Sequence, residues 1–245
     1  MAATHYAREK LALDVDGGER VPAILQRPRI AAAVPAVLLL HGFSSRKERV
    51  AESIGRALLA YDVASLAIDL PLHGAREGGL EGLTLRNPLA LVQKWRLALR
   101  EANQAIEHLA VHSAIDSTRL GLAGYSLGAY LAVIVAGDNR LVQAVALAAG
   151  GDLPEETPFA SLVRTIADPR RAARRLAGRP LLMINGRYDR TIRPEQARRL
   201  FDAAREPKEQ RWYEGGHWPP PSAIDRAAEW LAAQLRSPHS RVKNA

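Results

Sequence analysis

The chain has 245 residues, 47% of them hydrophobic, which suits a single α/β domain with a sizeable core. It contains no cysteine, which excludes disulfides and thiolate metal sites. The formal net charge is +8, but the basic residues are scattered and accompany no nucleic-acid motif, so we expect no nucleic-acid partner.

Apolar runs of strand length alternate along the chain with longer runs of helical spacing, a pattern typical of a parallel sheet covered by helices. The predicted strands are, in chain order, residues 11–15 and 21–26 as an opening hairpin, then 36–40, 63–69, 120–125, 141–149, 180–185 and 209–213. The predicted helices are residues 46–60, 88–110, 127–136, 194–204 and 222–235. The sequence therefore predicts a mostly parallel, twisted sheet of about eight strands flanked by helices.

Membrane segments are not expected. The N-terminal residues contain no apolar stretch of signal length, and no run approaches the roughly 18 apolar residues of a membrane span. We therefore expect a cytoplasmic protein with no membrane partner.

Residues 124–128 read Gly-Tyr-Ser-Leu-Gly, at the point where a predicted strand turns into a predicted helix. Such a tight turn strains the backbone of Ser126, and it requires glycine at 124 and 128 because side chains there would collide with the neighbouring strand and helix. The Ser126 hydroxyl would then stand clear of the sheet, at the positive end of a helix. The pattern predicts a nucleophilic serine.

A serine nucleophile needs a base, and the base needs a group that orients it. Asp189 follows one predicted strand, and His217 follows the last one after two glycines. The carboxyl ends of parallel strands meet at one edge of a sheet. We therefore predict that His217 is the base for Ser126 and that Asp189 orients His217.

Other assignments of the acidic residue are open. Asp189 could instead cap a helix or pair with a nearby arginine, and its rivals as the orienting acid are Asp152 and Glu195.

The turn His41-Gly42-Phe43 follows the predicted strand 36–40. A turn in this position can aim backbone N–H groups at a developing oxyanion, so we predict an oxyanion hole formed by the N–H groups of Phe43 and Leu127. His41 is expected to brace this loop rather than to act as the base.

The segment Asp69-Leu-Pro-Leu-His-Gly74 closes the next predicted strand. We interpret it as a turn in which Asp69 pairs locally with His73 or Arg76.

Together these segments resemble the serine α/β-hydrolase superfamily, in its esterase and dienelactone-hydrolase-like branch. Dienelactone hydrolases proper carry cysteine as the nucleophile, so Ser126 argues against that activity. The matching pieces are His41-Gly42-Phe43, Asp69-Leu-Pro-Leu-His-Gly74, Gly124-Tyr-Ser-Leu-Gly128, Asn185-Gly-Arg-Tyr-Asp189 and Gly215-Gly-His217.

The resemblance implies a serine carboxylesterase that hydrolyses short- to medium-chain esters through an acyl-enzyme, without a metal or an organic cofactor. Thioesterase, amidase or peptidase, and lactonase activities on the same Ser-His-Asp site are the alternatives. A non-catalytic binding protein on this scaffold and a polyanion-binding protein are less favoured.

Residues 150–179 separate two core strands by more than the roughly 2–6 residues of an ordinary connection. We predict that they form a small cap whose Phe159 and Leu162 face the substrate, and that the basic patch from Arg164 to Arg179 is its solvated face. An ordinary crossover helix without substrate contact is the alternative. Residues 80–95 and Trp218 are further candidates for the wall of the substrate site.

Overall fold

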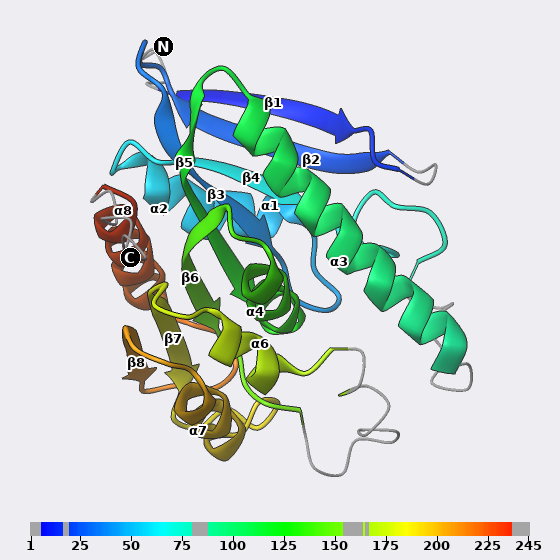
Figure 1. Cartoon of the computed structure of the whole chain (residues 1–245), viewed down its shortest axis with the longest axis vertical. Helices are drawn as coiled ribbons and strands as arrows, with labels where there is room; N and C mark the ends of the chain where they lie inside the picture. Colours follow the sequence, from blue (N-terminus) through cyan, green and yellow to red (C-terminus); the bar gives the residue numbers. More distant parts are fainter. Residues whose placement is uncertain (1–5, 17–19, 80–87, 154–163, 165–166, 237–245) are drawn as a thin grey trace, which may run out of the picture.

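The structure is a computed structural model, and it describes residues 6–16, 20–79, 88–153, 164 and 167–236. Eight strands form one sheet in the order β1-β2-β4-β3-β5-β6-β7-β8 (Figure 1). Strands β1 and β2 are antiparallel to each other, β2 is antiparallel to β4, and every other neighbouring pair is parallel. The predicted sheet is confirmed. The strands are β1 Tyr6–Leu13, β2 Val21–Pro28, β3 Val34–Leu40, β4 Ala64–Ile68, β5 Ile115–Tyr125, β6 Val142–Ala148, β7 Leu181–Gly186 and β8 Lys208–Tyr213.

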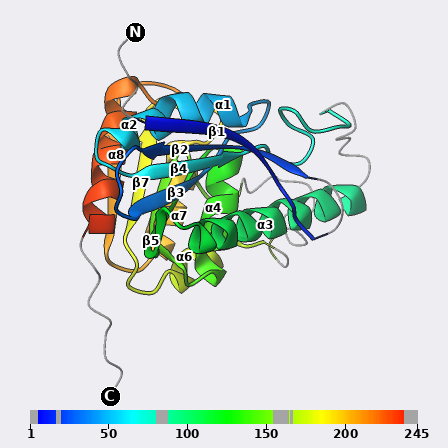
Figure 2. The same cartoon turned by 90° about the horizontal axis from the view of Figure 1, so that it is seen from above.

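Helices cover both faces of this sheet (Figure 2). On one face, the continuous helical segment α1 Lys47–Val50, η1 Ala51–Gly55 and α2 Arg56–Leu59 lies beside α8 Pro221–Arg236. On the other face lie α3 Pro88–Val111, α4 Leu127–Asp138 and α6 Pro169–Arg175, and α7 Pro194–Ala203 packs on β7. No helix among the residues that the structure describes is long and apolar enough to cross a membrane.

The middle of the predicted helix 46–60 is a π-helical turn, η1. Its last residue, Gly55, is packed so closely against the sheet that a Cβ there would lie 2.8 Å from Gln26 Oε1 and 2.9 Å from Ser65 Oγ. Glycine therefore allows this wide turn to approach the strands β2 and β4.

Strand β5 begins five residues before its predicted start at Leu120, because Ile115 pairs with Val34 of β3. The intervening residues are polar, and a register shift separates this pair from the rest of the ladder. The pattern of apolar runs misses such a segment, because Ile115 is its only apolar residue before Leu120.

The basic patch from Arg164 to Arg179 is only partly a solvated face. Arg171, Arg174 and Arg175 of α6 are exposed as predicted. Arg179, however, is buried, and its guanidinium donates hydrogen bonds to several backbone carbonyls, among them that of Val142 at 3.0 Å. Arg164 forms two hydrogen bonds with Asp152. The prediction is wrong for these two residues, because buried carbonyls and a buried carboxylate need donors.

Candidate active site

Ser126 stands at the junction of β5 and α4 with a backbone φ of 52° and ψ of −113°. Positive φ is strained for any residue other than glycine. A Cβ at Gly124 would overlap the carbonyl of Gly128, and one at Gly128 would overlap the carbonyl of Leu40. The hydroxyl of Ser126 is not used to cap α4. The local sequence thus presents a free-standing hydroxyl at the start of a helix.

The structure brings the three predicted side chains together. The Oγ of Ser126 lies 2.9 Å from Nε2 of His217. The other ring nitrogen, Nδ1, lies 2.8 Å from Oδ2 of Asp189. Because a carboxylate can only accept, Nδ1 carries a proton, and in the neutral imidazole Nε2 is then the free acceptor that faces the serine hydroxyl. This arrangement lets the imidazole take a proton from Ser126.

Backbone groups hold the carboxylate of Asp189 in this orientation. Its Oδ1 accepts hydrogen bonds from the N–H groups of Thr191, at 2.8 Å, and Ile192, at 3.0 Å. The residue is buried, so these two donors and the imidazole take the place of water. The N-cap residue of the helix α7 that follows is Arg193, so these turn contacts are not the helix cap considered as an alternative, and the other oxygen of Asp189 contacts His217.

The rival carboxylates lie in other ion pairs. Asp152 is buried and pairs with Arg164 at 3.0 Å and Arg199 at 3.5 Å. Glu195 is exposed and lies 3.9 Å from Arg198. Neither therefore competes with Asp189 for the imidazole in this structure.

The histidine loop reaches the serine because glycines allow a close approach. A Cβ at Gly186, the last residue of β7, would overlap the backbone carbonyls of Gly215 and Gly216. The hydroxyl of Tyr213 donates to the carbonyl of Gly216 at 2.9 Å. The loop is thereby fixed between the ends of β7 and β8.

The predicted oxyanion donors belong to two segments that come close to Ser126. Leu127 is the first residue of α4, so its N–H has no acceptor within the helix. The loop with Phe43 passes close to the nucleophile, since a Cβ at Gly42 would lie 3.3 Å from the Cβ of Ser126. Two backbone donors near Ser126 can stabilise a negatively charged oxygen.

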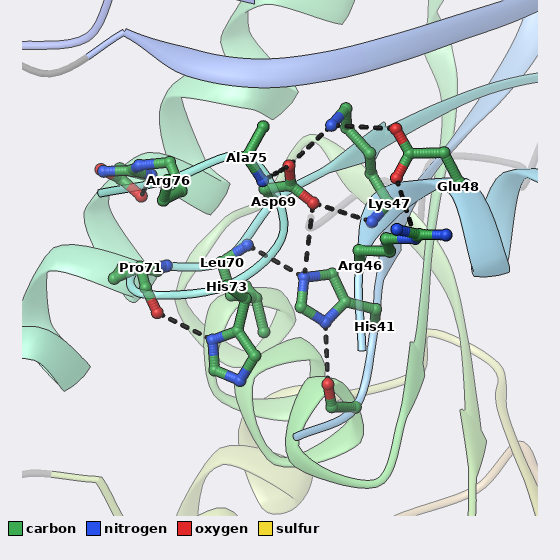
Figure 3. Close-up of polar contacts among 12 residues, drawn as sticks. His41, Arg46, Lys47, Glu48, Asp69, Leu70, Pro71, His73, Ala75 and Arg76 are labelled. Atoms are coloured by element: carbon green, nitrogen blue, oxygen red, sulfur yellow. Dashed lines mark hydrogen bonds and ion pairs between the residues drawn. The ribbon is translucent and has the colours of Figure 1, made fainter. Parts of the chain in front are cut away.

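His41 anchors the loop that contains Phe43 through hydrogen bonds of both its ring nitrogens. Its Nε2 accepts a hydrogen bond from the N–H of Leu70 at 3.1 Å, so the proton resides on Nδ1 and is donated to the carbonyl of Gly42 at 2.8 Å (Figure 3). The N–H of Ser45 donates to the same carbonyl at 3.2 Å. That carbonyl and the N–H of Phe43 belong to one planar peptide unit. Anchoring the carbonyl therefore orients the N–H of Phe43.

Asp69 does not pair with His73 or Arg76, as the sequence had suggested. Its carboxylate accepts from the backbone N–H of Lys47 at 2.8 Å and from the Nζ of Lys47 at 2.7 Å (Figure 3). Arg76 instead pairs with Glu101 at 2.9 Å. The partner was missed because Lys47 opens a helix and lies 22 residues away in the sequence. The buried pair ties the start of α1 to the end of β4.

Opposing effects act on the charge of Lys47. Burial lowers the pKa of its ammonium group, but hydrogen bonds with Asp69 and Glu48 outweigh burial and raise the pKa above its usual value. Lys47 therefore remains protonated at neutral pH and keeps the carboxylate of Asp69 paired.

Burial lowers the pKa of His41 to about 4, so the folded protein keeps this ring neutral at neutral pH. The unfolded chain binds the proton near pH 6.5. Between these values the unfolded state holds more protons, so the stability that the neutral ring contributes is complete above about pH 6.5 and decreases as the pH falls toward 4.

Between pH 6.5 and 4, we expect the free energy of unfolding of the wild type to fall with decreasing pH, and His41 to contribute up to about 1.4 kcal/mol per pH unit to this slope. The variant His41→Asn should lack that contribution. Urea unfolding at several pH values between 7 and 4.5 measures this slope in the wild type and the variant. An unchanged slope in His41→Asn would show that the ring is not the buried neutral group described here.

Comparison with known proteins decides the family. Residues 37–232 match the sequence profile of the group described as the alpha/beta hydrolase family. The chain belongs to the α/β-hydrolase family. This α/β-hydrolase carries the predicted fold across most of its length.

Among curated proteins, the chain is 29% identical over 140 residues to a probable 2-oxo-3-(5-oxofuran-2-ylidene)propanoate lactonase from Bradyrhizobium, covering 53% of each protein. The chain spans about half the length of the curated relatives that it matches. The crystal structure of TT1662 from Thermus thermophilus superposes with a TM-score of 0.78 at 22% identity, covering 94% of this chain and 99% of that one. A cold-adapted esterase from an Arctic intertidal metagenomic library superposes with a TM-score of 0.75 at 19% identity, covering 96% and 97%. At these identities the two structures support the fold.

The predicted substrate-binding residues of this α/β-hydrolase are only partly described. Phe159 and Leu162 lie outside the described residues, as does most of the first half of the predicted cap, so that prediction remains open. Trp218 is described and lies beside the triad. Its indole is 58% exposed, stacks on the ring of Tyr125 at 4.9 Å and meets the ring of His217 at 6.3 Å.

Over the described ranges, no group of three or more His, Asp or Glu side chains is arranged to hold a metal ion.

Proposed function

We propose that this α/β-hydrolase is a serine carboxylesterase that hydrolyses short- to medium-chain carboxylic esters. The observation that carries the proposal is the pair of hydrogen bonds from His217 to Asp189 and from Ser126 to His217, at 2.8 Å and 2.9 Å. A serine polarised in this way is suited to attack an acyl carbon.

In the proposed reaction, Oγ of Ser126 attacks the ester carbonyl while Nε2 of His217 takes its proton. The resulting oxyanion accepts hydrogen bonds from the N–H groups of Phe43 and Leu127. The imidazolium then protonates the leaving alcohol, and the acyl group stays on the serine. A water molecule, deprotonated by the same imidazole, attacks the acyl-enzyme; the imidazolium then returns the proton to the departing Oγ of Ser126 as the carboxylic acid is released, and Asp189 remains ionised throughout.

The comparisons support an acyl transfer to water on an ester. A similar fold occurs in a protein described as an esterase, and a partial sequence relative is described as a lactonase. A lactone is a cyclic ester, so lactone hydrolysis by the same residues is the second candidate. The fold by itself does not choose among acyl substrates.

A matched substrate panel tests the proposal. It contains p-nitrophenyl acetate, butyrate, octanoate and palmitate, the thioester and anilide of butyrate, and a five-membered lactone. We expect the highest kcat/KM on a p-nitrophenyl ester no longer than octanoate. A maximum on palmitate would contradict the chain length, and a higher value on the thioester, anilide or lactone would replace esterase by that activity.

A further inference from the structure

A cavity of about 390 Å³ lies between the sheet and the helices η1 and α8. Its wall is mostly apolar, and it includes Val50 and Ile54 from the helical segment, Ala123 and Ala146 from the sheet, and Ala223 and Ala227 from α8. This volume falls within the range of about 300–1,000 Å³ that is common for small-molecule sites. Four of these six side chains are alanines, which leaves space where larger side chains would fill a core.

The cavity adjoins the proposed catalytic residues. Tyr125, which precedes Ser126, and Trp218, which follows His217, both line it. The rings of Tyr125 and Trp218 lie 5.3 Å and 6.3 Å from the imidazole of His217. The same two rings therefore contact the cavity and the base, and they form the boundary between them.

We propose that this cavity receives the acyl chain of the ester, and that the substrates of this enzyme are esters of linear, medium-chain carboxylic acids. The inference rests on the proposed esterase function. It places the acyl pocket between η1 and α8, rather than under the predicted cap.

The chemistry of the wall suits an alkyl chain better than a polar group. The hydroxyl of Ser53 lines the cavity but already donates to the backbone carbonyl of Arg49 at 2.8 Å. Burying one methylene group there is worth about fourfold in kcat/KM, which corresponds to ~0.8 kcal/mol. A chain of several methylenes therefore gains substantially over acetate.

Trp218 lies where the cavity meets the proposed catalytic residues. Its indole stacks on the ring of Tyr125 and also contacts the guanidinium of Arg49, whose Cζ lies 5.1 Å from the ring centroid. The indole is nevertheless more exposed than buried, so it has solvent on one side into which it can turn. An acyl chain bound to Ser126 enters the cavity beside this ring.

The test fills the cavity and measures chain-length preference. The variants are Ala227→Phe, at a buried position of the wall, and Ile224→Trp, at a half-buried position of the wall that tolerates a larger ring more easily. The matched control is Ala233→Phe, on the exposed side of the same helix. The readout is the ratio of kcat/KM for p-nitrophenyl octanoate to that for the acetate, with the melting temperature recorded for each protein.

We expect either filling variant to lower this ratio at least tenfold and Ala233→Phe to leave it within about twofold of the wild type. An unchanged ratio in a filling variant that retains its melting temperature overturns the acyl pocket. Labelling with a small fluorophosphonate distinguishes a failure of the acyl pocket from a failure of the esterase function. Labelled Ser126 with an unchanged ratio contradicts the pocket alone, whereas failure to label the wild type contradicts the esterase function and the pocket with it.

Discussion

Asp189→Asn is expected to lower kcat about 10⁴-fold, the size of loss known for the same change in another Ser-His-Asp enzyme. The N–H groups of Thr191 and Ile192 hold the Oδ1 position, so the amide oxygen of an asparagine would take that place. Its NH₂ group would then face Nδ1 of His217 and favour the tautomer that is protonated on Nε2. A protonated Nε2 cannot accept the proton of Ser126.

The matched control for this prediction is Asp152→Asn. Asp152 is also buried, but it pairs with arginines rather than with His217. Steady-state kinetics on p-nitrophenyl butyrate should show a kcat within about tenfold of the wild type for this variant. A 10⁴-fold loss of kcat in Asp152→Asn, with little loss in Asp189→Asn, would show that Asp152 and not Asp189 orients His217.

Ser126→Ala is expected to reduce kcat by about 10⁶, the loss typical of removing the nucleophile of such a site. The fold should survive, because the hydroxyl bonds to the imidazole of His217 and does not cap α4. Alanine and serine also meet the same strain at positive φ.

Ser44→Ala is the control for Ser126→Ala. Ser44 is exposed and has a similar backbone, with φ of 56°, so the chemical change is the same in a comparable conformation. Its kcat should equal that of the wild type. If Ser126→Ala retains more than about a hundredth of the wild-type rate after purification from a host lacking other esterases, a different nucleophile is at work.

Much of the site follows from the order of strands and loops. Ser126, Asp189 and His217 each follow a strand of the parallel part of the sheet, and the ends of such strands share one edge. Gly-Gly before His217 and the glycines around Ser126 indicate loops that bend sharply. These features are local in sequence, which is why the meeting of the three side chains could be predicted.

Contacts between distant polar residues could not be predicted in the same way. Nothing near Lys47 indicates that it is buried against Asp69, because lysine at a helix start is usually exposed. Likewise, the sequence predicts that Arg179 belongs to a charged surface, although its guanidinium donates hydrogen bonds to buried backbone carbonyls. Such pairings depend on how loops pack on the finished sheet.

The position of the cavity also depends on tertiary packing. The length of residues 150–179 predicts a cap over the substrate, whereas the cavity that the structure describes lies between η1 and α8, beside Trp218. The alanines of α8 that line this space read in the sequence as ordinary core positions. Only their placement opposite the alanines of β5 and β6 shows that they leave space unfilled.

If Ser126 is a nucleophile activated by His217, it should react with a fluorophosphonate, which mass spectrometry of the intact protein and its peptides detects. We expect one adduct per chain, located on Ser126, absent from Ser126→Ala and formed much more slowly in His217→Ala. No adduct on the folded wild-type protein, or an adduct at another residue, would contradict it.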